Sequence, residues 1–203
     1  MPLKINAHRV NGARRYELVV MAASAGGVTA LRSLLAELPA DFPLPIAVVQ
    51  HRTAVRPNML AHVLGRRTSL IVKNAEEGEA MRAGTIYLAP PDAHMTVRAD
   101  RTVALHDGHK IRHVLSSANP LFESAAEALK GRVIAVVLTG YDRDATDGVQ
   151  AVKKSGGIVL AQSEASSLVY SMPQSAIATG SVDHILALHD IPLKLMRLAR
   201  EPR

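Results

Sequence analysis

Several short runs of the chain are apolar throughout, without alternation of polar and apolar residues. They include Leu18–Ala23, Ile46–Gln50 and Val133–Leu138, of which the last is the strongest. Such runs are typical of strands covered on both faces, as in a parallel sheet. Val28–Leu38 follows the first run and carries leucines at helical spacing. These are Leu31, Leu34, Leu35 and Leu38. The sequence therefore predicts a strand joined to a helix.

The same unit recurs along the chain. Further strands are expected at Leu70–Val72, Thr85–Ala89, Ile158–Gln162 and His184–Leu188. Met95–Val97 and Val103–Leu105 flank a polar turn region and predict a small antiparallel hairpin. Strands that alternate with helices predict the α/β class, with a single doubly wound, Rossmann-like and mainly parallel sheet covered by helices on both faces. No internal repeat or linker divides the chain, so we expect one domain.

Composition excludes several classes of site. The chain has 203 residues, 48% hydrophobic and 21% charged, which is enough to bury a core. It has no cysteine, so zinc-thiolate sites, disulfides and cysteine nucleophiles are excluded. Aromatic residues make up 3% and tryptophan is absent, which disfavours a protein that stacks on single-stranded nucleic acid.

Charge and hydropathy limit the classes of partner that the chain is expected to bind. The net charge of +6 suits acidic partners, but the cations are spread along the chain, so we expect no nucleic-acid groove. No apolar stretch approaches the roughly 18–20 residues of a membrane span, so we expect no membrane insertion. The first sixteen residues are basic and polar, unlike a secretory signal. We therefore expect a soluble, cytoplasmic protein.

Three kinds of side chain that could act together follow predicted strands. Ser24 and His51 come directly after two of them, and an acidic residue between Asp142 and Asp147 follows a third. In open α/β sheets, ligands bind at the carboxyl ends of the strands. A serine, a histidine and a carboxylate meeting there would suit nucleophilic catalysis, since the imidazole takes the hydroxyl proton and the carboxylate fixes the imidazole tautomer.

Other interpretations of these residues remain open from spacing alone. Ser24 is also a favourable N-cap for a helix beginning near Gly26. Gly26-Gly27 could hold a phosphate at a helix N-terminus, although the full GxGxxG pattern is absent. His51 could be a structural histidine.

Several motifs, in order along the chain, together resemble a known family. They are Ala23-Ser24-Ala25-Gly26-Gly27, Gln50-His51, Ile86-Tyr87-Leu88-Ala89-Pro90, Asp92-Ala93-His94-Met95, Leu138-Thr139-Gly140 and Met172-Pro173-Gln174-Ser175-Ala176-Ile177. From about Glu17 to Ile191 the chain resembles the catalytic domain of the chemotaxis protein-glutamate methylesterases (CheB). We therefore expect a methylesterase domain at residues 17–203, preceded by a leader at residues 1–16 that is basic in composition.

The resemblance also implies an activity and its residues. Members remove methyl groups from glutamate methyl esters on chemoreceptor helices, and some deamidate glutamine. Carried over by motif, Ser24 is the nucleophile, His51 the base and Asp144 the orienting acid. The implied partner is a methyl-accepting chemoreceptor or a related methylated protein. A receiver domain normally precedes this domain in the family, but here only about sixteen residues precede the first predicted strand. We therefore expect either a free-standing relative or regulation by a separate receiver or regulator protein. No metal or organic cofactor is needed for this chemistry. The oxyanion is expected to lie near the amides of Ala25 and Tyr141.

The chain departs from the family pattern at two places. Asp142 and Ala145 stand where the family usually has glycine, so we expect the acidic loop to follow a different path, with Asp142 and Asp147 as rivals to Asp144. Residues 52–56 replace the usual segment after the histidine and place Arg52 and Arg56 there. These departures leave two alternatives, a non-catalytic relative that binds signalling proteins and an esterase of small molecules.

A cluster of histidines invites a metal interpretation. His106, His109 and His113 lie close to Asp107, and imidazole and carboxylate are common metal ligands. Gly108 and Lys110 favour a turn instead, so we expect solvated loop histidines. His94 belongs to a family motif and is expected near the active-site face, with no catalytic role assigned.

Overall fold

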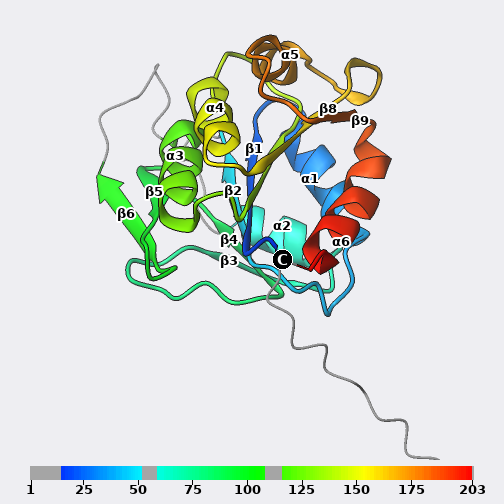
Figure 1. The fold of residues 1–203 in the computed structure, drawn as a ribbon. Helices are drawn as coiled ribbons and strands as arrows, with labels where there is room; N and C mark the ends of the chain where they lie inside the picture. Colours follow the sequence, from blue (N-terminus) through cyan, green and yellow to red (C-terminus); the bar gives the residue numbers. More distant parts are fainter. Residues whose placement is uncertain (1–14, 52–58, 108–115, 203) are drawn as a thin grey trace, which may run out of the picture.

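A parallel sheet runs through the centre of the molecule (Figure 1). The computed structural model describes residues 15–51, 59–107 and 116–202, and within these ranges the sheet has seven strands in the order β3-β4-β2-β1-β7-β8-β9. Every pair of neighbouring strands is parallel. The strands are β1 (Leu18–Ala23), β2 (Ile46–Gln50), β3 (Ile71–Asn74), β4 (Thr85–Leu88), β7 (Val133–Val137), β8 (Ile158–Gln162) and β9 (His184–Leu186).

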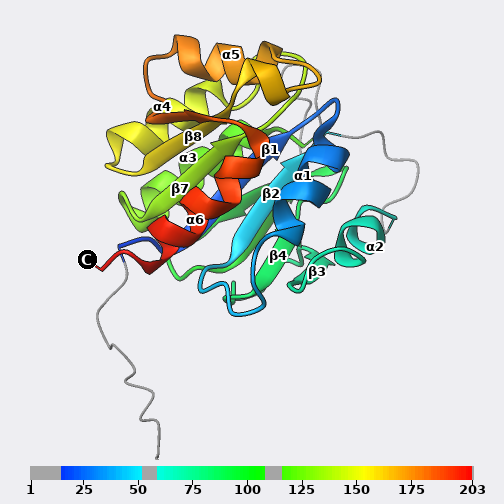
Figure 2. The same ribbon diagram turned by 90° about the vertical axis from the view of Figure 1, so that its right-hand side faces the viewer.

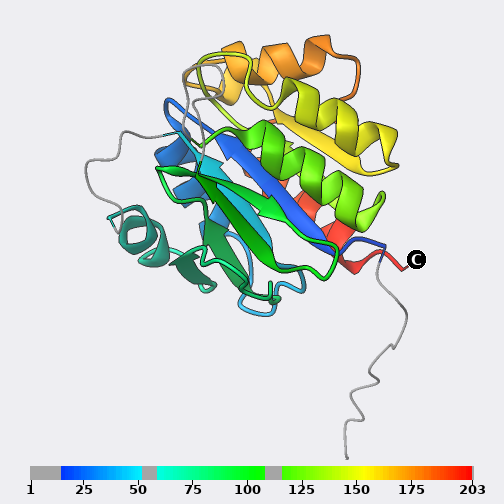
Figure 3. The same cartoon turned by 90° about the vertical axis from the view of Figure 1, so that its left-hand side faces the viewer.

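Helices cover both faces of the sheet. One face carries α1 (Gly27–Ala36), α2 (Met59–Gly65) and α6 (Ile191–Arg200), seen in Figure 2. The other carries α3 (Ala118–Leu129), α4 (Thr146–Lys154) and α5 (Ser171–Ala178), seen in Figure 3. Two short 3₁₀ helices, η1 (Glu164–Ser166) and η2 (Leu188–Asp190), complete this part of the chain.

The two helical layers explain why the strands are apolar throughout. Along β1, the side chains of Val19, Met21 and Ala23 pack into one core cluster. The alternate side chains, those of Leu18, Val20 and Ala22, pack into the other cluster. All six residues are buried, so neither face of the strand has a position for a polar side chain.

The predicted hairpin is confirmed. β5 (Ala93–Val97) pairs with β6 (Val103–Asp107) in antiparallel register, with Val97 opposite Val103. β5 packs against α3, outside the main sheet (Figure 3). The predicted fold class, a doubly wound α/β protein with a small hairpin, is therefore confirmed.

Several strand boundaries differ from the prediction by one or two residues. β4 ends at Leu88 and β7 at Val137, each one residue earlier than predicted. β3 runs to Asn74, because Lys73 and Asn74 still pair with Tyr87 and Leu88. β9 ends at Leu186, because its one partner, β8, ends at Gln162 in the paired register. Residues 1–14 of the predicted leader lie outside the described residues. No helix in the described ranges is long and apolar enough to cross a membrane.

Candidate active site

The order of the strands reverses beside β1. The chain passes from β1 outward through β2 on one side and later returns to β7 on the other. In open α/β sheets, such a switch point leaves a crevice at the carboxyl ends of the strands. Ser24 follows β1, His51 follows β2, and Asp144 lies in the loop between β7 and α4. The fold therefore brings together side chains that are more than a hundred residues apart in sequence.

Backbone hydrogen bonds continue the sheet past the strand ends and fix these positions. The Ser24 amide donates to the Thr139 carbonyl at 3.0 Å, and the His51 amide donates to the Ala23 carbonyl at 3.0 Å. Gln50 adds a brace, since its side-chain amide donates to the carbonyls of both Ser24 and His51 at 2.9 Å. The serine turn and the histidine are therefore held against each other by main-chain hydrogen bonds and by the Gln50 side chain.

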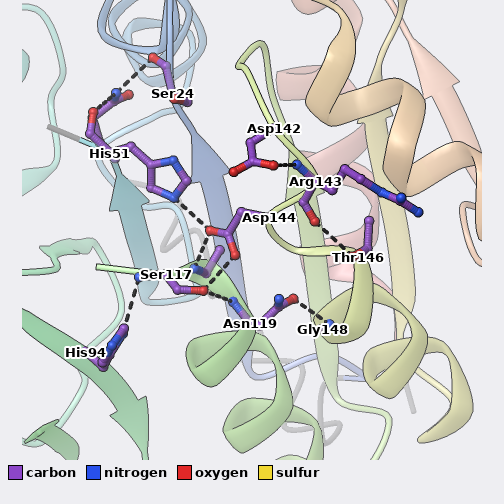
Figure 4. Close-up of polar contacts among 12 residues, drawn as sticks. Ser24, His51, His94, Ser117, Asn119, Asp142, Arg143, Asp144, Thr146 and Gly148 are labelled. Atoms are coloured by element: carbon purple, nitrogen blue, oxygen red, sulfur yellow. Dashed lines mark hydrogen bonds and ion pairs between the residues drawn. The ribbon is translucent and has the colours of Figure 1, made fainter. Parts of the chain in front are cut away.

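The central contact joins His51 to Asp144. His51 Nε2 lies 2.7 Å from Asp144 Oδ2, and the two side chains are 12% and 4% exposed (Figure 4). An ionised carboxylate can only accept, so Nε2 carries the proton and a neutral ring keeps Nδ1 as its acceptor. Ser24 lies on the opposite side of the ring from Asp144 in Figure 4. Nδ1 is therefore the nitrogen available to a serine hydroxyl.

Asp144 is held by more than the histidine. The Ser117 hydroxyl donates to Oδ1 and the Ala118 amide donates to Oδ2, both at 2.6 Å. These groups form the N-terminus of α3, where the helix dipole favours a negative charge. Burial by itself would raise the pKa of Asp144, but the hydrogen bonds from His51, Ser117 and Ala118 outweigh it and lower the pKa below its usual value. The carboxyl group is therefore ionised at neutral pH.

Gly140 leaves the space that Ser24 occupies. A methyl group on its Cα would lie 2.6 Å from Ser24 Cβ and 3.1 Å from Met172 Cε, closer than atoms can approach without displacement. The Gly140 carbonyl also accepts from the Met172 amide at 2.9 Å. The Leu138-Thr139-Gly140 motif therefore supports the serine turn from the side of β7.

The acidic loop keeps a glycine-like backbone although two of its residues are not glycine. Asp142 has a φ of 76° and Ala145 a φ of 73°, both in the left-handed region. The expectation of a different path, based on these substitutions, is therefore not supported by the backbone of either residue. Aspartate tolerates this region better than most residues, whereas the backbone of Ala145 is sterically strained there by its Cβ.

Of the three acids in the loop, Asp144 is the one that contacts His51. Asp142 is exposed, and its Oδ1 accepts from the Arg143 amide at 2.7 Å. Asp147 is exposed in the first turn of α4. The geometry thus distinguishes residues that the sequence left as rivals.

The structure also bears on the helix-capping role of Ser24 and on the metal interpretation of the histidine cluster. The helix-capping role of Ser24 is wrong, because Gly26, with a φ of 78°, is the N-cap of α1 and no side chain caps that helix among the described residues. The described residues contain no group of three or more His, Asp or Glu side chains that could hold a metal ion. His106 contacts the Thr96 hydroxyl at 2.9 Å. His109, His113, Arg52 and Arg56 lie outside the described residues.

Sequence reasoning missed Ser117 and gave no role to Gln50 or His94. Ser117 is the N-cap of α3, a position that its residue type and the following Asn119-Pro120 could have indicated. Its bond to Asp144 spans 27 residues and has no sequence signal. His94 is buried, and its Nδ1 accepts from the Ser117 amide at 3.3 Å. His94 therefore supports the residue that supports Asp144 (Figure 4).

Two backbone amides near Ser24 could donate hydrogen bonds to an oxyanion. Among the described residues, the amides of Ala25 and Tyr141 donate no backbone hydrogen bond, whereas those of Gly27 and Gly140 donate to Ser24 and Val169. Both positions adjoin the serine turn, one directly and one through Gly140. They are the positions at which an oxyanion was expected.

Comparison with known proteins identifies the class. A model of the CheB methylesterase family matches residues 19–195. A relative from Leptospira interrogans is 34% identical over 183 residues, which cover 90% of this chain and 95% of the relative. The protein-glutamate methylesterase/protein-glutamine glutaminase 2 of Caulobacter vibrioides is 42% identical over 179 residues, covering 86% of this chain and 52% of that protein.

A solved structure agrees with these matches. The crystal structure of the Thermotoga maritima CheB methylesterase catalytic domain superposes with a TM-score of 0.88 at 37% identity, covering 90% of this chain and 98% of that one. The fold and the matches thus define a hydrolase of the methylesterase class. The chain belongs to the CheB methylesterase family.

Proposed function

We propose that this protein hydrolyses the methyl esters of glutamate side chains in methylated chemoreceptors, with Ser24 as nucleophile, His51 as base and Asp144 as the orienting acid. The observation that carries the proposal is the buried His51–Asp144 pair at 2.7 Å beside the Ser24 turn. Names of relatives support the substrate, since the matched Caulobacter protein is a protein-glutamate methylesterase/protein-glutamine glutaminase.

The reaction proceeds by two acyl transfers. Ser24 Oγ attacks the ester carbonyl carbon while its proton passes to His51 Nδ1. The bond to the methoxy oxygen then breaks, the imidazolium returns the proton to that oxygen, and methanol leaves. Water attacks the resulting glutamyl-Ser24 ester by the same route, which frees the carboxylate and restores the serine. Asp144 stays ionised throughout and stabilises the imidazolium.

The amides of Ala25 and Tyr141 are proposed to hold the oxyanion. Backbone donors placed where negative charge develops lower the barrier without moving during the reaction. Glutamine deamidation would use the same residues, with ammonia in place of methanol as the leaving group. The two activities in the Caulobacter relative's name favour this second reaction.

The remaining assignments are proposals of the same kind. We place the methylesterase domain at residues 17–203, in the cytoplasm, with a methylated chemoreceptor as substrate and a receiver or regulator protein as a further partner. Neither a nucleic acid nor a membrane is a proposed partner.

Methanol release tests the proposed function. A methylated chemoreceptor fragment is incubated with the wild type and with Ser24→Ala, and methanol and ammonia are measured separately. We expect the wild type to release methanol and the variant to release none above the spontaneous rate. Equal release by both proteins, or none by a folded wild type, would contradict the proposal. Ammonia without methanol would assign the site to deamidation.

A further inference from the structure

Three exposed apolar residues lie in segments that adjoin the Ser24 turn. Val28 lies in the first turn of α1, Tyr141 follows Gly140, and Leu168 lies between η1 and α5. They are 39%, 65% and 78% exposed. We call Val28, Tyr141 and Leu168 the apolar rim. Large apolar side chains that gather at one edge of a functional site commonly mark a binding surface.

Leu168 is held in its exposed position by the residues that support Ser24. The Val169 amide donates to the Thr139 hydroxyl at 2.9 Å, and the Val169 carbonyl accepts from the Gly140 amide at 2.9 Å. The Thr139 hydroxyl also lies 3.0 Å from the Ala25 carbonyl. The backbone beside Leu168 is thus fixed to both halves of the serine turn.

Leu168 also packs directly on that turn. A methyl group on the Gly26 Cα would lie 2.8 Å from Leu168 Cβ. The base of the leucine side chain therefore contacts the turn two residues beyond Ser24, while most of the side chain faces solvent. An exposed leucine with an ordered backbone loses little further conformational freedom on binding, which favours a contact role.

We infer that the apolar rim, with Leu168 as its main contact, binds aliphatic side chains that flank the esterified glutamate of a protein substrate. Leu168 and Val28 lie close enough to the Ser24 turn, through Gly26 and the start of α1, to contact a polypeptide whose ester carbonyl is bound at Ser24. Leu168 and Val28 then meet the neighbouring substrate residues and not the reacting atoms. The inference rests on the proposed function and names a determinant of its specificity.

The test compares a protein substrate with a small one. kcat/KM is measured on a methylated receptor fragment and on p-nitrophenyl acetate, whose acetyl group offers no flanking residues. Leu168→Ser should lower kcat/KM on the receptor by about 5- to 20-fold, chiefly through KM, because it removes apolar contact area. The kcat/KM for p-nitrophenyl acetate should change less than about 2-fold, because this small ester has no flanking residues that could contact Leu168. Leu168→Met keeps an apolar side chain at this position and should hydrolyse the receptor fragment at close to the wild-type rate.

Ile71→Ser is the matched control. Ile71 is 66% exposed but lies on β3, at the end of the strand order and away from β1. It should leave both substrates unaffected. Receptor hydrolysis by Leu168→Ser at the wild-type level would overturn the inference, and so would an equal loss on both substrates, which would assign Leu168 to the support of Ser24. A wild type inactive on the receptor contradicts the proposed function instead.

Discussion

At Asp144, burial and hydrogen bonding act on the pKa in opposite directions. Burial favours the protonated form, whereas His51, the Ser117 hydroxyl and the Ala118 amide favour the charged form and prevail. The anion is thus retained in a site from which water is largely excluded. A carboxylate so placed can orient an imidazole and stabilise its protonated form during a reaction.

The first prediction separates the three acids of the loop. Asp144→Asn should lower kcat for the methyl ester by about 10⁴-fold, because the amide favours the wrong imidazole tautomer. Asp142→Asn and Asp147→Asn serve as controls in the same loop and should cost less than about 10-fold, since Asp144 alone of the three contacts His51. A larger loss in Asp142→Asn than in Asp144→Asn would contradict the assignment.

Ser117 gives a prediction about pH and stability. Ser117→Ala removes a hydrogen bond that lowers the pKa of Asp144, so that pKa should rise. A lowered pKa stabilises the fold above the unfolded pKa, and this contribution is lost as the pH falls through the folded pKa. The variant should therefore be about 1–3 kcal/mol less stable at pH 7, and the deficit should shrink below about pH 4.

Urea unfolding at several pH values measures this effect. Ser155→Ala is the control, because the Ser155 hydroxyl donates to the Val152 carbonyl and, within the described part of the chain, to no carboxylate. Its deficit should be independent of pH. Part of the Ser117→Ala deficit should persist in acid, about 0.5–1 kcal/mol, since the hydroxyl also caps α3. A deficit that stays constant across the whole range would contradict the account of Asp144.

At the scale of elements, the loop between β7 and α4 holds its path at a steric cost. Ala145 is fully buried, is the N-cap of α4 and has a φ of 73°. Ala145→Gly relieves the backbone but loses a buried methyl group, so we expect its stability within about 1 kcal/mol of the wild type. Ala145→Val should lose about 2–4 kcal/mol, from backbone strain and overpacking. Thermal or urea unfolding of both variants checks this, and equal stability of the two would refute it.

Most elements could be predicted because they carry strong local signals. Leu18–Ala23 and Ile46–Gln50 are continuous apolar runs, and each is a strand with the expected bounds. The end of β9 could not be predicted, because it depends on where β8 stops. Strand type is encoded locally, whereas strand length depends partly on the neighbouring strand.

The candidate site was predictable where residues follow strands. Ser24 and His51 are placed by the ends of β1 and β2, which the sequence marks clearly. The bond from Ser117 to Asp144 joins a helix cap to a loop, and no periodicity relates them. The left-handed backbone of Ala145 could not be predicted from its residue type, because alanine gives no local preference for it.

At the scale of the whole molecule, the sheet separates packing from chemistry. Two core clusters occupy its two faces, while the site uses the carboxyl edge where the strand order reverses. Substitutions within the clusters should therefore change stability first. Substitutions at the edge should change activity first.

The net charge of the molecule predicts how salt affects hydrolysis of a receptor substrate. A charge of +6 should aid encounter with a receptor fragment that carries a net negative charge, chiefly by raising the association rate. Salt screens exposed charges over about 8–10 Å at roughly 0.10–0.15 M. kcat/KM for a receptor fragment should fall as salt rises, and the paired change of Arg52 and Arg56 to Ala should flatten that dependence. A neutral small ester is the control. A receptor hydrolysed equally at low and high salt would rule out steering.

Covalent labelling of Ser24 is the most direct test of the proposed site. A fluorophosphonate probe is added to the folded wild type, to Ser24→Ala and to His51→Ala, and the modified peptide is identified by mass. We expect a single phosphonyl group on Ser24 in the wild type, no label in Ser24→Ala, and labelling at least about 10³-fold slower in His51→Ala, because an unassisted hydroxyl is a weak nucleophile. Labelling of another residue, or equal labelling in the His51 variant, would contradict the assignment of Ser24 and His51 as nucleophile and base.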